Sequence, residues 1–285
     1  MATGDHDALP RNGQPLLSAR GVRRSFGGLV AVDVHEFDVR RGTITALIGP
    51  NGAGKSTLFN ILTGFERADA GTWSLDGREV TGVAAHRLAR SGMVRTFQLT
   101  RSLADLTLEE NVLLAAPGQR GEGILGALLE RRTWRRQERE NTDRARALLS
   151  RFGLERMAQE PASVLSGGQR KLLEMARALM CEPQLLLLDE PMAGVNPRLV
   201  ETLLDHIREV RADGTTILFV EHDMDVVADI SDEVVCMAFG TVLSTGTPAQ
   251  VMRDPEVIDA YLGSDEPEDG ADQGARRPAG GDDEA

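Results

Sequence analysis

The sequence predicts an α/β fold in which a buried, largely parallel sheet carries a phosphate-binding loop. A glycine-rich segment, Gly49 to Thr57, fits the pattern G-x-x-x-x-G-K-[ST] and lies between a predicted buried strand and a predicted helix. A second apolar run, Leu185 to Leu188, ends in an acidic pair at the edge where open α/β sheets bind their ligands. These observations predict one nucleotide-binding α/β domain.

The predicted elements form one domain with two lobes. Residues Leu16 to Val39 alternate in polarity and carry turns, which predicts an antiparallel sheet that includes Phe26. The phosphate-loop unit follows, and we expect a mainly helical insertion from about Arg87 to Glu160. After the second apolar strand we expect a helix over Pro197 to Ala212, a strand over Thr216 to Val220 and a hairpin across Val234 to Thr245.

The phosphate loop is the most specific motif. Its glycines let several backbone N–H groups point into one concavity, Lys55 reaches the β and γ phosphates, and the Ser56 hydroxyl is placed to ligate Mg²⁺. A strand over Thr43 to Ile48 precedes it, and a helix from Ser56 to Thr63 turns its positive end toward the phosphates. Chance would produce this pattern only about 0.002 times in a chain of this composition. The residues expected to hold the nucleotide are Gly49, Pro50, Asn51, Gly52, Ala53, Gly54, Lys55, Ser56 and Thr57.

The acidic pair Asp189 and Glu190 predicts the catalytic groups. One carboxylate must face a metal ion while its neighbour polarises the attacking water, so we expect Asp189 to bind Mg²⁺ and Glu190 to act as the general base. An acidic pair at the end of a strand also fits a helix N-cap. The nearby phosphate loop favours the catalytic interpretation.

A short motif, Leu165 to Gln169, precedes the acidic strand by one helix and Pro183. Ser166 is placed to cap a helix in which Leu172, Met175 and Leu179 recur at helical spacing, so the start of that helix predicts an anion site. The motif resembles the LSGGQ signature of ATP-binding cassette (ABC) ATPases, in which the signature of one copy closes over ATP held by another copy.

This resemblance implies a P-loop NTPase fold of the ABC cassette type. The fold has a RecA-like core, an antiparallel β subdomain and a helical subdomain, here over about residues 87–180 of a domain spanning 16–263. It implies ATP and Mg²⁺ as ligands and a dimer in which Ser166, Gly167, Gly168 and Gln169 contact the ATP of the partner copy.

The ABC resemblance also assigns three single residues. Gln98 matches the Q-loop glutamine, which contacts Mg²⁺ and water while its loop contacts a partner; the implied metal set is Ser56, Gln98 and Asp189. His222 matches the switch histidine that hydrogen-bonds the γ phosphate. Phe26, 23 residues ahead of Gly49, matches the aromatic residue that stacks on adenine. Taken singly, a lone histidine is more often structural and Phe26 fits a core residue, but their order and spacing favour the functional roles.

Further segments narrow the resemblance to the ATP-binding subunit of branched-chain amino acid importers, over nearly all of Leu16 to Gly263. Urea and amide importers share the pattern. Two positions depart from the common ABC pattern: Asn196 stands where the D-loop usually ends in Asp, and Phe26 offers no hydroxyl. The segments are Arg95 to Gln98, Thr107 to Val112, Ala193 to Pro197, Glu221 to Met224, and Ala260 to Gly263.

The resemblance implies an ATP-hydrolysing subunit that drives uptake of branched-chain amino acids or a related small polar solute. The implied partners are a second cassette, identical or related, transmembrane permease subunits and, indirectly, an extracytoplasmic solute-binding protein. An exporter cassette of the lipopolysaccharide type, a soluble ABC ATPase of DNA repair or translation, and a module that holds ATP without turnover remain alternatives. The intact Asp189, Glu190 and His222 disfavour the last.

Composition agrees with a peripheral protein at the cytoplasmic face of the cell membrane. We find no apolar stretch near the roughly 20 residues that a membrane helix needs and no signal peptide at Met1 to Pro10. Cys181 and Cys236 fit a reducing cytosol rather than a disulfide scaffold. The net charge of −12 disfavours nucleic-acid binding. Residues 1–15 and the acidic segment 264–285 predict disordered tails.

A basic arm distinguishes the helical insertion. The simpler interpretation is a solvated helix whose apolar residues pack inward. A sharper hypothesis is that the arm approaches the membrane surface or the permease, because it is basic within an acidic protein. Its arginines, all between Ile124 and Arg151, are Arg131, Arg132, Arg135, Arg136, Arg139, Arg144 and Arg146.

Overall fold

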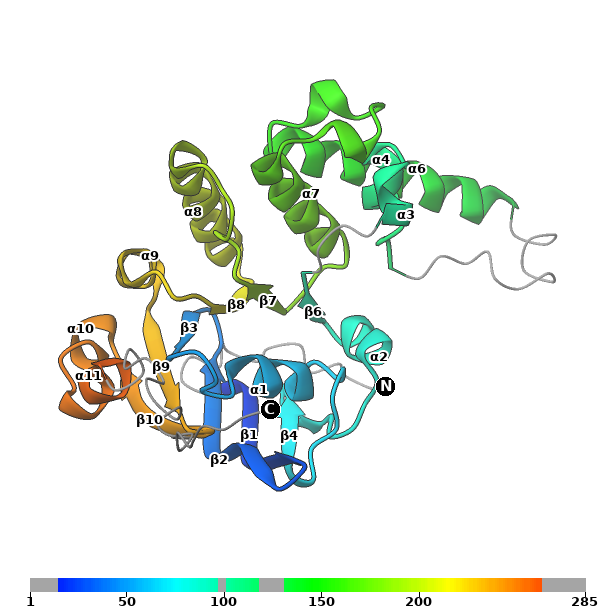
Figure 1. Ribbon diagram of the computed structural model, residues 1–285. Helices are drawn as coiled ribbons and strands as arrows, with labels where there is room; N and C mark the ends of the chain where they lie inside the picture. The colour runs from blue at the N-terminus through cyan, green and yellow to red at the C-terminus, as the bar shows by residue number, and fades with distance from the viewer. Residues whose placement is uncertain (1–14, 97–100, 118–130, 263–285) are drawn as a thin grey trace, which may run out of the picture.

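The computed structural model describes residues 15–96, 101–117 and 131–262, and within these ranges two sheets lie below a lobe of helices (Figure 1). The predicted tails, except Pro15, lie outside the described residues. The strands are β1 (Pro15–Phe26), β2 (Leu29–Arg40), β3 (Ile44–Ile48), β4 (Ala70–Leu75), β5 (Arg78–Glu79), β6 (Met93–Arg95), β7 (Leu185–Asp189), β8 (Thr216–Val220), β9 (Glu233–Ala238) and β10 (Thr241–Gly246). The α-helices are α1 (Lys55–Leu62), α2 (Ala85–Arg90), α3 (Arg101–Ala104), α4 (Leu108–Leu113), α6 (Arg131–Arg151), α7 (Gly167–Met180), α8 (Pro197–Ala212), α9 (Met224–Ile230), α10 (Pro248–Val251) and α11 (Pro255–Leu262).

The central sheet has the strand order β10-β9-β3-β8-β7-β6. β3 pairs in parallel with β8 and β9, β7 pairs in parallel with β6 and β8, and β10 closes the sheet as an antiparallel hairpin with β9. Every residue of β3 and β8 is buried, as expected for apolar strands of a parallel sheet covered on both faces. The predicted strands before the phosphate loop and before His222 are therefore confirmed.

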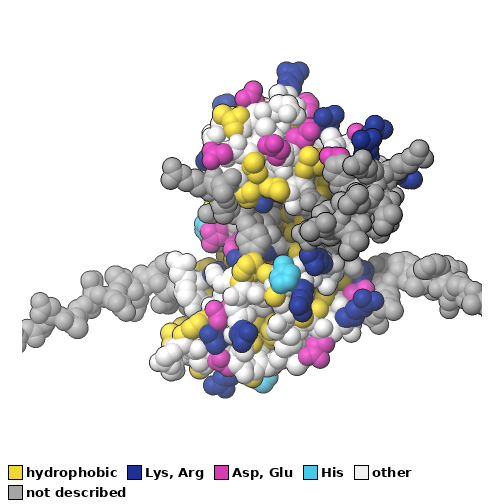
Figure 2. All heavy atoms as spheres, turned by 90° about the vertical axis from the view of Figure 1, so that its right-hand side faces the viewer, with side chains coloured by type: hydrophobic (Ala, Val, Ile, Leu, Met, Phe, Trp, Pro, Cys, Tyr) yellow, Lys and Arg dark blue, Asp and Glu magenta, His cyan; other side chains and the backbone are white. Residues whose placement is uncertain are grey.

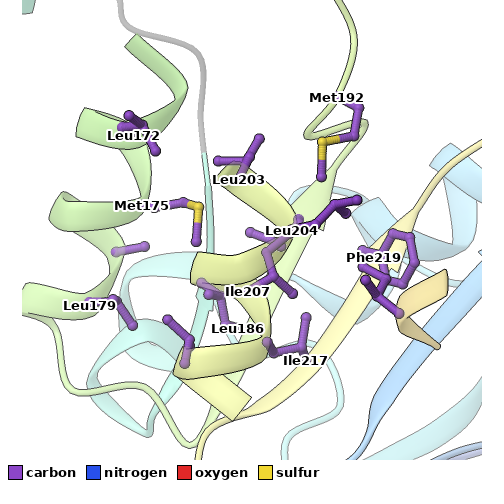
Figure 3. Close-up of a cluster of buried hydrophobic side chains, with 14 of the residues drawn as sticks. Leu172, Met175, Leu179, Leu186, Met192, Leu203, Leu204, Ile207, Ile217 and Phe219 are labelled. Atoms are coloured by element: carbon purple, nitrogen blue, oxygen red, sulfur yellow. The ribbon is translucent and has the colours of Figure 1, made fainter. Parts of the chain in front are cut away.

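Alternate side chains of β7 enter two different hydrophobic cores. Leu186 and Leu188 pack in the same cluster as α7 and α8, where Figure 3 shows Leu186 beside Ile207 and Ile217. Leu185 and Leu187 belong to the other cluster, which includes residues of α1 and of the antiparallel sheet. The four consecutive leucines therefore place the acidic pair at the edge of a sheet that is held from both sides.

The antiparallel sheet confirms the prediction for the first part of the chain. Its order is β2-β1-β4-β5, and the β1–β2 hairpin closes where Phe26 pairs with Leu29. Gly27 and Gly28 form the turn with φ values of 52° and 93°, which glycine adopts without steric cost. α1 packs against this sheet through Leu58, Phe59, Ile61 and Leu62.

A short strand interrupts the predicted helical insertion near its start. The prediction of helical structure from about residue 87 is wrong for Met93–Arg95, because this segment forms β6 and pairs with β7 in the central sheet. Three residues are too short a run to reveal a strand by periodicity. Beyond β6, α4, α6 and α7 pack together through buried residues that include Leu108, Leu149 and Leu173.

The basic arm forms part of this lobe as α6. Its apolar residues Ala145 and Leu149 are fully buried, as the simpler interpretation of a solvated helix with inward-packed apolar residues requires. Arg146 pairs with Glu109 at 2.9 Å, and Arg136 pairs with Glu140 at 2.7 Å. Basic and acidic side chains lie interspersed over this part of the surface in Figure 2. Contact of the arm with a membrane or permease stays a prediction. Among the helices of the described ranges, none is both long and apolar enough to cross a bilayer.

Candidate active site

The phosphate loop follows β3 and is enclosed by neighbouring backbone. Gly49 has φ 145°, and a side chain there would collide with the carbonyl oxygen of Met237 in β9. Gly54 has φ 94°, and a side chain there would collide with the carbonyl oxygen of Ala31 in β2. Glycine is therefore required at both ends of the loop, because backbone from two other strands lies where a Cβ atom would be.

Lys55 begins α1 and turns back over the loop. Its ammonium donates hydrogen bonds to the carbonyl oxygens of Gly49 at 2.6 Å and Pro50 at 2.8 Å. Burial lowers the pKa of Lys55, while the carboxylate of Glu190 opposes this shift. Gly54 is the N-cap residue of α1 and supplies no side-chain hydrogen bond to the first N–H groups of the helix. The loop and the positive end of α1 therefore form a site suited to phosphate.

The acidic pair lies at the end of β7, close to the start of α1. Asp189 is the last residue of β7 and pairs with Val220, and Glu190 follows with φ 44°, a left-handed conformation that costs a non-glycine residue about 1–3 kcal/mol. The Glu190 N–H donates to the carbonyl of Val220 at 3.1 Å, which helps to hold this conformation. Backbone strain of this kind concentrates at functional sites.

A cavity of about 320 Å³ brings three predicted residues together: Ser56, Asp189 and Glu190. It is also lined by Arg95, whose guanidinium contacts Asp189, and by Lys171, whose ammonium lies 3.4 Å from the Glu190 carbonyl oxygen. The sequence did not assign either of these two basic residues to the site. Their signal was their position in two motifs, since Arg95 precedes Gln98 and Lys171 follows the signature.

The signature forms the start of α7, as predicted. The Ser166 hydroxyl accepts a hydrogen bond from the Gln169 N–H at 3.3 Å, and the Gln169 side chain accepts one from the Ser166 N–H at 3.0 Å. Gly168 packs against Leu199 of α8 so closely that a side chain would collide with it. The capping pair and this contact fix where the first N–H groups of α7 point.

Two other predicted residues, His222 and Phe26, have exposed side chains. His222 has a side chain that is 69% exposed, and its backbone N–H donates to Glu221 at 3.2 Å. Phe26 is 45% exposed, and the Arg24 guanidinium lies 4.6 Å from its ring centre. Gln98 lies outside the described residues. Asn196, the departure in the D-loop, caps α8 by accepting a hydrogen bond from the Arg198 N–H at 3.0 Å.

Glu221 is a site residue for which the sequence predicted no role. Its side chain is 1% exposed, and it accepts hydrogen bonds from the N–H groups of Met192 at 2.9 Å and His222. One buried carboxylate therefore ties the segment after Glu190 to the segment that carries His222. An acidic residue directly after a buried strand was the available signal.

Comparison with known proteins decides the family. A model of ABC transporters matches residues 32–193, and a model of branched-chain amino acid ATP-binding cassette transporters matches residues 241–267. The chain belongs to the ABC transporter family. It is 44% identical to the high-affinity branched-chain amino acid transport ATP-binding protein LivG of Escherichia coli and 41% identical to BraF of Pseudomonas aeruginosa, covering 88% of this chain and 98% of each relative.

Solved structures agree with this assignment. An ATP-binding cassette of an ABC transporter in its ADP conformation is 35% identical, with a TM-score of 0.77, and the match covers 88% of this chain and 99% of that one. The cassette cbiO1 of Clostridium perfringens is 28% identical, with a TM-score of 0.69 over 86% and 93% of the two chains. The predicted ABC fold and the predicted ATP-hydrolysing transport subunit are therefore confirmed.

In this ABC ATPase, helix α11 lies beside the phosphate loop. Tyr261 of α11 is the chain's one tyrosine. Burial raises its pKa to about 12, the Cys236 thiol adds to this rise, and the nearby backbone of Gly49 opposes it. α11 therefore lies against the first residue of the phosphate loop.

The free energy of unfolding of the Glu221→Ala variant is expected to be about 2–3 kcal/mol lower than that of the wild type, because two backbone N–H groups would lose their buried acceptor. Glu221→Gln keeps one acceptor oxygen and should lose less. Thermal unfolding of the three proteins gives the order wild type, Gln, Ala. A Glu221→Ala protein as stable as the wild type would show that water replaces the carboxylate at no cost.

Proposed function

We propose that this ABC ATPase powers the uptake of branched-chain amino acids through a membrane permease. The observation that carries the proposal is that Ser56, Asp189 and Glu190 line one cavity beside the Lys55 loop. Support for the cargo comes from LivG and BraF, which are named for high-affinity branched-chain amino acid transport.

The residue types fit magnesium and an attacking water. Ser56 is exposed in the first turn of α1 and Asp189 ends β7, so a hydroxyl and a carboxylate oxygen, the ligands that Mg²⁺ prefers, line the same cavity. When bound, the metal would offset negative charge on the phosphates. Glu190 would accept a proton from water, and His222 with Gln98 would contact the γ phosphate.

The second half of each ATP site would come from another cassette. Ser166 and Gly168 lie at the start of α7, and we propose that this helix start binds the ATP held by the partner's phosphate loop. Phe26 would stack on the adenine. The exposed side chains of Phe26 and His222 leave both available to a ligand or partner. The assembly would lie at the cytoplasmic face of the membrane.

The test is reconstitution. The protein is co-expressed with candidate permease subunits, the complex is inserted in proteoliposomes, and uptake of radiolabelled leucine, isoleucine and valine is measured with and without ATP. ATP-dependent uptake that unlabelled leucine suppresses is expected. Failure to purify with any multi-span protein would favour a soluble ABC ATPase, and ATP-driven movement in the opposite direction would favour an exporter.

A further inference from the structure

Arg95 holds the carboxylate of Asp189 from the end of β6. Its side chain is 12% exposed, and one terminal nitrogen lies 2.5 Å from Asp189 Oδ2. The other terminal nitrogen donates to Asn60 Oδ1 at 2.6 Å and lies 3.4 Å from Thr63 Oγ1, both on α1 or at its end. One guanidinium therefore joins three parts of the core: β6, β7 and the helix that follows the phosphate loop.

The surroundings of Arg95 select a guanidinium rather than an ammonium. The group lies over the ring of Phe59 at 5.0 Å and near that of Phe65 at 5.7 Å. A planar fork stacks on aromatic rings and directs separate N–H groups to separate acceptors, whereas an ammonium is a compact point charge. Arg95 is thus held by acceptors on α1 and by two aromatic rings as well as by Asp189.

This pair has a consequence for the metal. Asp189 is the carboxylate that the proposed function assigns to Mg²⁺, and one of its two oxygens already accepts a short, charge-assisted hydrogen bond. A fixed positive charge beside a carboxylate lowers its attraction for a cation. The guanidinium and a metal ion therefore compete for the same carboxylate.

We propose that Arg95 is a positioning residue that acts as the counter-ion of Asp189 and sets the affinity of the nucleotide site for its metal ion. Without metal, Arg95 orients Asp189 and neutralises its charge. With metal and nucleotide bound, the Asp189 carboxylate would interact with the metal as well as with Arg95, and Arg95 would keep its contacts with Asn60. The inference rests on the proposed assignment of Asp189 as a metal residue.

Manganese serves as the probe, because free Mn²⁺ is measured directly by electron paramagnetic resonance. The ADP-saturated protein is titrated with Mn²⁺, and the Kd for the metal is compared between variants. Arg95→Met is expected to bind Mn²⁺ on the order of 10-fold more tightly than the wild type, since one nearby positive charge is removed. Arg95→Lys keeps the charge and should shift the Kd much less.

The matched control is Arg151→Met. Arg151 is also partly buried and pairs with Asp213 at 2.6 Å, but this pair joins the end of α6 to the end of α8. The control should leave the Mn²⁺ Kd unchanged even if it lowers stability. Binding of ADP in EDTA confirms that each variant is folded. If Arg95→Met does not fold, the neutral Arg95→Gln, which keeps a side-chain N–H donor, takes its place.

Two outcomes overturn the inference: unchanged or weaker Mn²⁺ binding by Arg95→Met, or an equal change in the Arg151→Met control. Asp189→Asn separates these from a failure of the proposed function. If Asp189→Asn binds Mn²⁺ as tightly as the wild type, Asp189 is not the metal residue and both fail. If it binds more than about 10-fold less tightly while Arg95→Met shows no tightening, the role of Arg95 alone is wrong.

Discussion

The Glu190→Gln variant is expected to bind ATP with an affinity close to that of the wild type and to hydrolyse it about 10²- to 10⁴-fold more slowly. The amide has nearly the same shape as the carboxylate, so the left-handed backbone at this position and its hydrogen bond to Val220 should persist. What the amide lacks is the ability to accept a proton from water. The effect should therefore fall on turnover and not on binding.

Phosphate release under saturating ATP measures turnover, and calorimetric titration measures binding. Gel filtration with ATP adds a third measurement, because a protein that binds ATP without hydrolysing it should accumulate as a dimer if two cassettes close over the nucleotide. Glu201→Gln, the same substitution at an exposed position of α8, is the control and should turn over ATP as the wild type does. Near-normal hydrolysis by Glu190→Gln would remove Glu190 as the general base.

Local sequence was sufficient to predict the parts of the site that depend on neighbours along the chain. The phosphate loop is such a part, because its glycines, Lys55 and the flanking strand and helix lie within one continuous segment. The cap of α7 is another, since Ser166 and Gln169 are three residues apart and satisfy each other's backbone N–H groups. Four consecutive leucines likewise predicted a strand buried on both faces.

Contacts between distant segments were not predictable in the same way. Arg95 meets Asn60 and Asp189, which lie 35 and 94 residues away, only because β6 pairs with β7 and α1 packs beneath them. The contact of Tyr261 with Gly49 depends on where α11 packs. No pattern within either segment encodes such a partner. β6 itself was missed because a three-residue strand at a sheet edge has too few positions to show a period.

Loss of the Lys55 ammonium is expected to weaken ATP binding more than any other single change considered, with Lys55→Ala raising the Kd by on the order of 10²-fold or more. The ammonium is half-buried and is held by two carbonyl oxygens of the loop, so it occupies the concavity that the phosphates would enter. A charge-assisted hydrogen bond to phosphate contributes about 1.5–3 kcal/mol, and alanine also leaves those carbonyl oxygens without a donor.

Lys55→Arg separates charge from shape. A guanidinium keeps the positive charge but is larger and planar, and it replaces an ammonium that two loop carbonyl oxygens hold at 2.6 and 2.8 Å, so binding should be weaker than in the wild type and stronger than with alanine. Direct titration with ATP in EDTA, where no metal bridges the phosphates to Asp189, isolates the contribution of the lysine. A Kd for Lys55→Ala within about 10-fold of the wild type would mean that the loop amides and the start of α1 hold the phosphates without the ammonium. In that case Lys55 would act on hydrolysis alone, and Lys55→Ala would lower turnover at saturating ATP with little change in affinity.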